Sequence, residues 1–183
     1  WLGEKMASLL NKTYQPLSEY ETHYEILYGS QSLREKLVKY FAQELDIETS
    51  ADEIFLAAGC SALLEMAAWA LANPGDLAIV ISPFYPGFNH DLTAKAQVTP
   101  LYVDIDQGGL SQVNTSYLDK ALSEARSNQK QVRFLLISSP ANPTGKVYSS
   151  HELKALLDWC EKNQVFLISD EIYANSVYDP DKN

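Results

Sequence analysis

Two short polar segments that directly follow apolar runs carry the residues best suited to chemistry. The apolar run at residues 132–138 ends in a turn-forming cluster with two prolines and a glycine, and Asn142 lies on that bend. A second run ends at Asp170, and Tyr173 follows shortly after it. A carboxylate at the end of a buried strand needs a cationic or hydrogen-bond-donating partner. Because open α/β sheets bind ligands beyond the carboxyl ends of their strands, both segments are candidate parts of a binding site.

Two further turns present groups that bind ligands. Gly59-Cys60-Ser61 opens a helix rich in alanine and leucine, and the free N–H groups and positive dipole of such a helix start suit a phosphate, with the Ser61 hydroxyl as an extra donor. Tyr85 lies between two prolines, so its ring is held in a way that suits stacking on a planar ligand. Taken alone, each residue also has a structural explanation: a helix cap for Ser61 and Asp170, core packing for Tyr173, and an exposed turn aromatic for Tyr85.

The pattern of apolar residues indicates how these turns are positioned. Short apolar runs alternate with amphipathic or alanine-rich segments, which predicts parallel strands joined by right-handed helical crossovers. The predicted fold class is therefore α/β, a three-layer αβα sandwich with a mostly parallel sheet, in which all four turns lie at one edge. The strands are expected at 53–58, 77–82, 98–103, 132–138 and 165–169, and the helices at 2–10, 32–45 (capped by Ser30), 62–72, 89–96, 117–126 and 150–163.

Composition excludes several classes of function. The chain has 183 residues and a formal net charge of −10, which opposes binding to nucleic acid or to an anionic membrane. No apolar segment is long enough to cross a bilayer, and no signal peptide is visible. The two cysteines, Cys60 and Cys160, indicate reduced thiols in a cytoplasmic protein. The three histidines lack the spacing of metal ligands. The sequence has no Gly-x-Gly-x-x-Gly loop and no Walker loop, so no motif supports nucleotide binding. It also has no Gly-x-Ser-x-Gly elbow, so no motif supports a serine hydrolase.

Five segments together resemble the large domain of class I/II pyridoxal-phosphate-dependent aminotransferases, the aspartate aminotransferase fold. Asn142-Pro143-Thr144-Gly145 matches the family's Asn-Pro-x-Gly, and Asp170-Glu171-Ile172-Tyr173 matches its Asp-Glu-x-Tyr. The stretch from Gly29 to Arg34 resembles its Gly-x-x-x-Leu-Arg motif. Residues 58–62 and 85–92 look most like the 1-aminocyclopropane-1-carboxylate synthase branch, although that branch's Asp-Arg-Asp reads Asn89-His90-Asp91 here.

The resemblance implies a pyridoxal 5'-phosphate site and a role for each candidate residue. Gly59, Cys60 and Ser61 would hold the cofactor phosphate, and Tyr85 would stack on the pyridine ring. Asn142 and Tyr173 would donate hydrogen bonds to the ring's phenolic oxygen. Asp170 would pair with the pyridine nitrogen and keep it protonated, which draws electrons from the substrate; Asp170 and Tyr173 are the expected catalytic residues. The resemblance also implies an amino-acid substrate and a homodimer, in which Tyr24 or Tyr28 would reach the phosphate of the partner subunit.

The resemblance also implies parts that this sequence lacks. The family's Schiff-base lysine lies in a Ser-x-x-Lys segment downstream of Asp-Glu-x-Tyr, and neither Lys146 nor Lys182 matches it. We therefore expect residues 1–29 to be an N-terminal helix end and loop, residues 30–183 to be the N-terminal part of the cofactor-binding domain, and the C-terminal small domain to be absent. The first hypothesis is an aminotransferase or a lyase like the synthase branch, inactive as this fragment alone. The alternative is a truncated, inactive homologue that serves as a binding or structural module.

Overall fold

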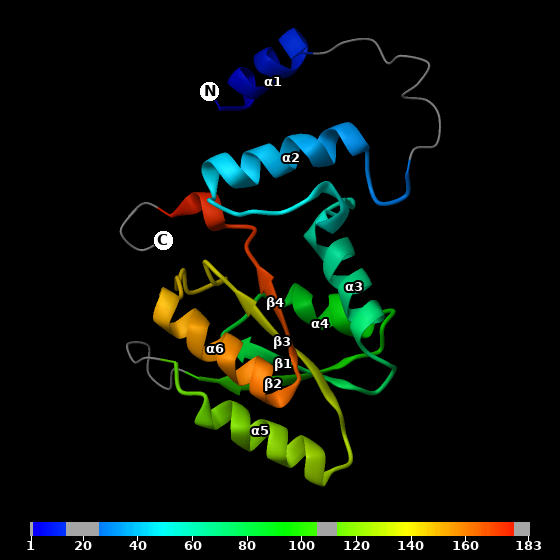
Figure 1. The fold of residues 1–183 in the computed structure, drawn as a ribbon, viewed down its shortest axis with the longest axis vertical. Coiled ribbons are helices and arrows are strands. Elements are labelled where there is room, and N and C mark those ends of the chain that lie inside the picture. The colour runs from blue at the N-terminus through cyan, green and yellow to red at the C-terminus, as the bar shows by residue number, and fades with distance from the viewer. Residues whose placement is uncertain (1, 14–25, 106–112, 178–183) are drawn as a thin grey trace. The chain divides into compact units, whose positions relative to one another are not determined.

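The chain forms two compact units, residues 1–57 and 58–183, and each is described by itself. The structure is a computed structural model, and it describes residues 2–13, 26–105 and 113–177 (Figure 1). Tyr24 and Lys182 lie outside the described residues. No described helix has the length and apolar character that a membrane span requires.

A four-stranded parallel sheet forms the centre of the second unit. Its strands are β1 (Leu77–Ser82), β2 (Thr99–Asp104), β3 (Val132–Ser138) and β4 (Phe166–Asp170), in the spatial order β2-β1-β3-β4. In the register Ser82 is paired with Asp104, and Ser138 is paired with Asp170. The carboxyl ends of the strands therefore meet at one edge, as the alternation in the sequence predicts.

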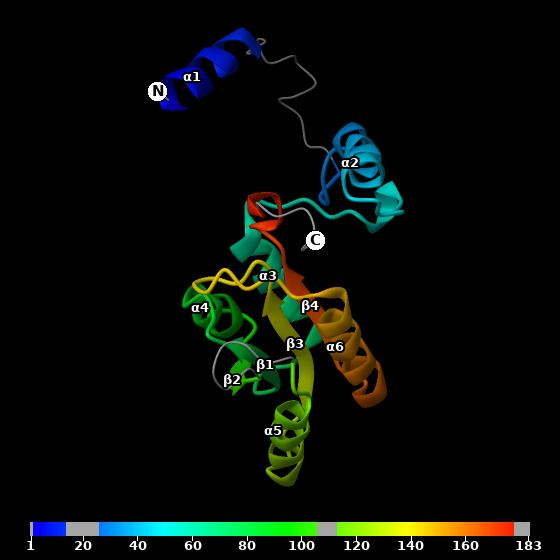
Figure 2. The same cartoon turned by 90° about the vertical axis from the view of Figure 1, so that its left-hand side faces the viewer.

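Helices cover both faces of this sheet, so the predicted α/β class with three layers is confirmed. α3 (Cys60–Leu71) and α4 (Gly87–Thr93) enclose one apolar core, which includes Val80 and Leu136 of the strands. α5 (Ser116–Ser127) and α6 (Ser150–Asn163) enclose the other, which includes Ile79 and Leu135. Adjacent strand residues thus point to opposite cores, because side chains alternate along a strand. Figure 2 shows α4 and α6 on opposite sides of the strands.

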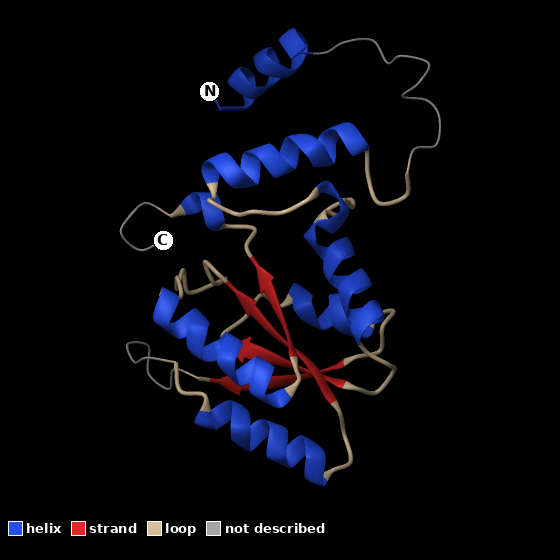
Figure 3. Cartoon of the chain, viewed as in Figure 1, coloured by secondary structure: helices blue, strands red, loops and turns tan. Residues whose placement is uncertain are grey.

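The prediction of a strand at residues 53–58 is wrong. Ala51–Glu53 form the 3-10 helix η2, and residues 54–58 form a loop that pairs with no strand of the sheet, as the segment before α3 in Figure 3 shows. The Leu56 N–H donates to the Tyr28 carbonyl, which lies in the first unit. Phe55 remains 49% exposed, so the apolar run here does not mark a buried strand.

β4 is also less enclosed than its sequence indicates. Among the described strands β4 lies at the end of the order, and Phe166 is 59% exposed. The apolar run at 166–168 therefore has a partly open face, because only β3 pairs with it. After β4 the chain continues through Tyr173 into the 3-10 helix η3 (Ala174–Ser176).

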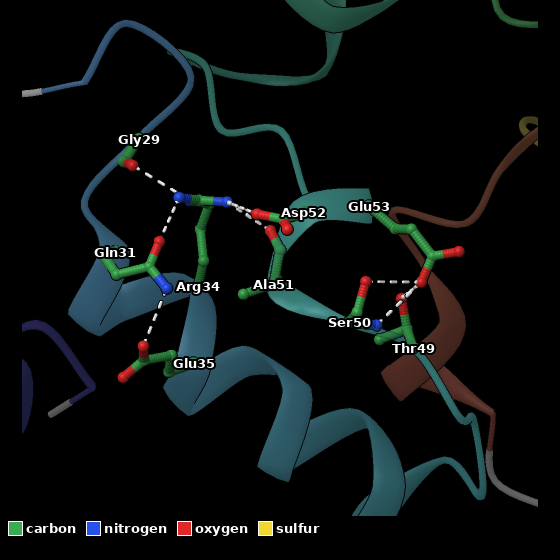
Figure 4. Close-up of polar contacts among 9 residues, drawn as sticks. All are labelled: Gly29, Gln31, Arg34, Glu35, Thr49, Ser50, Ala51, Asp52 and Glu53. Carbon is green, nitrogen blue, oxygen red and sulfur yellow. Dashed lines mark hydrogen bonds and ion pairs between the residues drawn. The ribbon is translucent and has the colours of Figure 1, made fainter.

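One buried arginine organises the first unit, which contains α1 (Leu2–Thr13), α2 (Gln31–Glu44) and η2. Arg34 is 1% exposed, and its guanidinium donates to the Gly29 carbonyl at 3.1 Å, to the Ala51 carbonyl and to the Gln31 side chain (Figure 4). It also lies 4.5 Å from the centre of the Tyr28 ring. A buried charge is tolerated only with such partners, so Arg34 ties the start of α2 to η2. Ser30 is the N-cap residue of α2, but its side chain makes no capping bond.

A capping box begins α6 and gives the second unit a pH-dependent contact. The Ser149 side chain accepts from the Glu152 N–H, and the Glu152 carboxylate accepts from the Ser149 N–H at 2.9 Å. Burial raises the pKa of Glu152, but the Ser149 hydrogen bonds and the Lys146 ammonium outweigh burial and leave the pKa below its ordinary value of 4.5. The ionised form therefore stabilises the fold, and this stabilisation is lost as the pH falls through the folded-state pKa.

We expect Glu152→Gln to flatten the pH dependence of stability. In the parent protein the free energy of unfolding should fall between about pH 5 and pH 3 as Glu152 is protonated. The variant should be less stable at pH 7 and should lose less stability on acidification. Urea unfolding at several pH values measures both effects. Glu161→Gln, at an exposed site of the same helix, is the control, and equal acid dependence in both variants would contradict the assignment.

Candidate functional site

The candidate residues lie around the carboxyl edge of the sheet. Asp170 is the last residue of β4. Tyr173 follows three residues later and is the N-cap residue of η3. Asn142 follows β3, and Tyr85 follows β1 just before α4. Cys60 begins α3. Three of the four predicted turns therefore follow strands, and the fourth reaches the same edge from an unpaired segment.

A direct contact joins the start of α3 to the end of β4. The Cys60 thiol donates to Asp170 Oδ1 at 3.4 Å, although the two residues are 110 positions apart. The Ile172 N–H donates to the same carboxylate oxygen at 3.1 Å. Among the residues that the structure describes, no cationic side chain pairs with Asp170. The carboxylate thus has neutral donors but no counter-charge.

The charge of Asp170 affects the thiol beside it. Burial raises the pKa of the Cys60 thiol, and the negative charges of Asp170 and then Asp91 raise it further, to about 11. Burial alone raises the pKa of Cys160 to about 11 as well. Both thiols are free, so at neutral pH Cys60 is a hydrogen-bond donor to Asp170 and not a thiolate nucleophile.

The first turn of α3 is open to a ligand. Gly59 has a φ of +98°, a conformation that favours glycine, and no side chain caps the helix. The N–H groups of Cys60 and Ser61 lie in this uncapped first turn, and residues 59–61 are exposed. An α-helix presents such unpaired N–H groups together with a partial positive charge of about one half at this end. The start of α3 therefore suits an anion.

Asp91 is a residue of this site that the sequence analysis did not assign. The Ser61 hydroxyl donates to Asp91 Oδ2 at 3.2 Å, and Asp91 is buried on α4. Its signal in the sequence is an acid within the apolar stripe of a helix, because Phe88 and Leu92 flank it on the same buried face. Since Ser61 has one hydroxyl proton, backbone N–H groups are the donors that remain for an anion here.

Packing fixes the aromatic ring of Tyr85 and leaves it accessible. The ring lies over Gly87, where an added Cβ would overlap Tyr85 Cε1, and meets Phe88 edge-on with 5.6 Å between centroids. The neighbouring Phe84 stacks on Tyr102 at 4.6 Å. Tyr85 nevertheless remains 43% exposed. A rigid ring with an open side suits stacking against a planar ligand.

Asn142 and Tyr173 lie at the same edge, and among the described residues no hydrogen bond joins either side chain to Asp170. The loop that carries Asn142 is anchored by the Ser139 N–H, which donates to the Asp170 carbonyl at 3.0 Å, and by the Ala141 N–H, which donates to the Lys146 carbonyl at 2.8 Å. Within the described ranges neither the Asn142 nor the Tyr173 side chain has a hydrogen-bond partner. Both remain able to donate to a ligand.

These features together define what the edge can bind. An anionic group fits the start of α3, a cationic group fits beside Asp170, and a planar group fits against Tyr85. The contact between Cys60 and Asp170 means that the first two positions are neighbours. No group of three or more described histidine, cysteine, aspartate or glutamate residues has the arrangement of a metal site. The edge therefore suits a small planar zwitterion with a phosphate or carboxylate arm.

Known proteins are similar to this chain in sequence and in fold. Residues 17–183 match the family model for aminotransferase class I and II. The chain is 37% identical over 127 residues to 1-aminocyclopropane-1-carboxylate synthase 7 of Arabidopsis thaliana, covering 69% of this chain and 28% of that protein. An amino transferase structure from Eubacterium rectale aligns with a TM-score of 0.81 at 26% identity, over 97% of this chain and 44% of its own. An aspartate aminotransferase from Thermotoga maritima gives 0.76 at 26% identity, over 97% and 44%. The chain thus spans less than half the length of each of these proteins.

We expect Asp170→Asn to increase the alkylation rate of Cys60. Removing the nearby negative charge lowers the pKa of the thiol, so the reactive thiolate is more abundant at a given pH. Iodoacetamide labelling followed by mass spectrometry at pH 7–10 should show a severalfold faster reaction at Cys60. Cys160 in the same molecule is the internal control, because burial alone raises its pKa. Unchanged Cys60 reactivity would mean that the thiol and the carboxylate are not neighbours.

Proposed function

The chain belongs to the aminotransferase class I and II family, and we propose that it forms the cofactor-binding edge of a pyridoxal-phosphate-dependent enzyme that acts on an amino acid. Members of this family, including the related 1-aminocyclopropane-1-carboxylate synthases, depend on pyridoxal phosphate. The observation that carries the proposal is the contact between Cys60 and Asp170. It brings a carboxylate without a counter-charge next to an uncapped helix start.

The residues of the edge fit this cofactor in charge and shape. Pyridoxal phosphate has a phosphate at one end and a basic ring nitrogen at the other. Asp170 lacks a cationic partner among the described residues, so a protonated ring nitrogen would satisfy it. The first turn of α3 would hold the phosphate mainly through the N–H groups of Cys60 and Ser61, because the Ser61 hydroxyl donates to Asp91.

The chain's own residues would orient the cofactor and tune its charge. When bound, pyridoxal phosphate supplies an electron-withdrawing ring that stabilises a carbanion at the substrate's α-carbon. Asp170 would keep the ring nitrogen protonated through a charge-assisted hydrogen bond in a partly desolvated site. Tyr85 would cover one ring face. Asn142 and Tyr173, whose side chains have no hydrogen-bond partner in the described ranges, would donate to the phenolic oxygen.

Further parts of the proposal concern the whole protein. We assign residues 30–183 to the N-terminal part of the cofactor-binding domain. The active form would be a cytoplasmic homodimer, in keeping with two free thiols, in which Tyr24 or Tyr28 reaches the partner's phosphate. Similarity to both 1-aminocyclopropane-1-carboxylate synthases and aminotransferases supports an amino-acid substrate for either reaction.

We expect Asp170→Ala to weaken the binding of pyridoxal phosphate at least tenfold. The lost charge-assisted hydrogen bond is a strong one, and bonds of this kind contribute about 1.5–3 kcal/mol. Titration of the full protein, followed by quenching of tryptophan fluorescence or by equilibrium dialysis, measures the affinity. Asp170→Asn, which keeps the shape without the charge, should have an intermediate affinity.

Asp158→Ala removes an exposed acid of α6 and is the matched control for this titration. Thermal unfolding of each variant separates loss of binding from loss of fold. Unchanged affinity in Asp170→Ala, with the fold intact, would contradict the proposed role of Asp170. Turnover of amino acids by the Asp170→Ala protein at the parent rate would likewise contradict the role proposed for Asp170.

We expect Gly87→Ala to weaken cofactor binding without unfolding the protein. The new methyl group would overlap Tyr85 Cε1, so the partly exposed ring must move from its position over residue 87. The affinity for pyridoxal phosphate should approach that of Tyr85→Ala, while the melting temperature changes little. Tyr85→Phe, which keeps the ring, should bind like the parent protein. Parent-like affinity in Gly87→Ala would exclude stacking by the ring in this position.

A further inference from the structure

A pocket lies at the edge of the sheet opposite the candidate site, where the chain returns from α5 to β3 and from α6 to β4. Its volume is about 490 Å³, within the range of small-molecule sites. The residues around it are basic, amide-bearing or apolar. They are Leu71, Leu122, Arg126, Gln129, Lys130, Gln131, Val132, Arg133, Asn163, Gln164 and Phe166.

The pocket concentrates positive charge in an acidic chain. Three of its lining residues are cations and none is an acid, although the chain as a whole has a net charge of −10. Arg133 is paired with Asp76 at 2.7 Å, and the Lys130 ammonium lies 3.4 Å from the Gly75 carbonyl. Arg126 has no partner among the described residues. Two cations, Arg126 and Lys130, are therefore not balanced by a carboxylate.

Helix dipoles reduce this charge but do not cancel it. α5 and α6 both end at the pocket, and each C-terminus carries a partial negative charge of about one half. Two unbalanced cations exceed this sum of about one charge. The groups that line the pocket thus sum to a net positive charge, which favours an anion over a cation or a neutral molecule.

Two strained glutamines add hydrogen-bond donors to the pocket. Gln129 and Gln164 each have a φ of 56°, in the left-handed region that favours glycine or asparagine. Gln97, in the loop before β2, has the same conformation (φ 54°) but does not line the pocket. The left-handed backbone is thus common to these loops. At Gln129 and Gln164 it occurs in residues whose side chains carry an amide and line the pocket.

Apolar side chains form the rest of the wall. Phe166, Leu122 and Leu71 line the pocket beside the cations, and the exposed ring of Phe166 offers a flat apolar surface. A bare inorganic ion would leave this surface in water. A ligand with both an anionic group and a carbon skeleton would use both parts of the wall.

We propose that this pocket binds a small organic anion that carries phosphate or carboxylate groups. Arg126 and Lys130 supply the counter-charge, Gln129 and Gln164 donate hydrogen bonds, and Phe166 contacts the carbon skeleton. The site is separate from the carboxyl edge, because it lies at the amino ends of β3 and β4. The proposal for this pocket therefore does not depend on the proposed cofactor site.

The first test measures binding of citrate and inorganic phosphate to the full protein by calorimetry, without pyridoxal phosphate, because that molecule is itself an organic phosphate and would compete for the pocket. Citrate should bind more tightly than phosphate, and Arg126→Gln/Lys130→Gln should weaken citrate binding at least tenfold. Lys120→Gln/Lys154→Gln, which removes two exposed lysines of α5 and α6 outside the pocket, should bind like the parent. Equal binding by both double variants, or no citrate binding by the parent protein, would overturn the proposal.

The second test uses the strained glutamines, because here stability and binding should change in opposite directions. Gln129→Gly/Gln164→Gly relieves the left-handed backbone and removes both amides. We expect a melting temperature equal to or above that of the parent and citrate affinity lowered severalfold. Gln97→Gly should share the effect on stability and leave binding unchanged. Parent-like citrate affinity in the double glycine variant would contradict the role of these amides.

A final comparison separates the two edges. Asp170→Ala should leave citrate affinity unchanged, while Arg126→Gln/Lys130→Gln should leave the Asp170-dependent binding of pyridoxal phosphate unchanged. If Asp170→Ala lowered citrate affinity as much as the basic double variant does, citrate would be bound at the carboxyl edge and the proposal would be wrong.

Discussion

The parallel register of the sheet is the constraint on which the candidate site depends. Ser138 is paired with Asp170 and Val80 with Leu136, so the turns after β1, β3 and β4 must open at one edge. The helices run back along the sheet, and α3 begins where β4 ends, which allows Cys60 to touch Asp170 across 110 positions of sequence. A slip of one residue would exchange the two faces of a strand, and both cores would then be disrupted.

The sequence predicted the parts of this arrangement that depend on local signals. The expected helix at 150–163 agrees with α6 at both ends, because a capping box starts it and a left-handed Gln164 ends it. The prediction at 53–58 failed because an apolar loop whose Leu56 N–H donates to the Tyr28 carbonyl has the same residue pattern as a sheet strand. Asp91 went unassigned because its partner Ser61 lies 30 positions away on another helix. Local pattern carries no information about such pairings.

The arginine of the Gly-x-x-x-Leu-Arg motif shows a related limit of sequence reasoning. Arg34 is the one buried residue among the described residues of the first unit, and two of its acceptors are backbone carbonyls, of Gly29 and Ala51. Any residue type offers a carbonyl, so the sequence could not identify these partners. The physical reason for the arginine is nevertheless clear, since a planar group with five donors can join a turn, a helix start and η2 at once.

The two edges of the sheet have opposite electrostatic characters, and helix direction explains both. In a parallel α/β unit the helices begin at the carboxyl edge and end at the amino edge. The carboxyl edge therefore combines positive helix starts with acids such as Asp91 and Asp170, while the amino edge combines negative helix ends with Arg126 and Lys130. An acid near a helix start makes that start selective, because a ligand must then bring a cation together with its anion. Asp170 thus repels a simple phosphate and attracts the cationic part of a zwitterion. This selectivity distinguishes the carboxyl edge from the basic pocket at the other end of the strands.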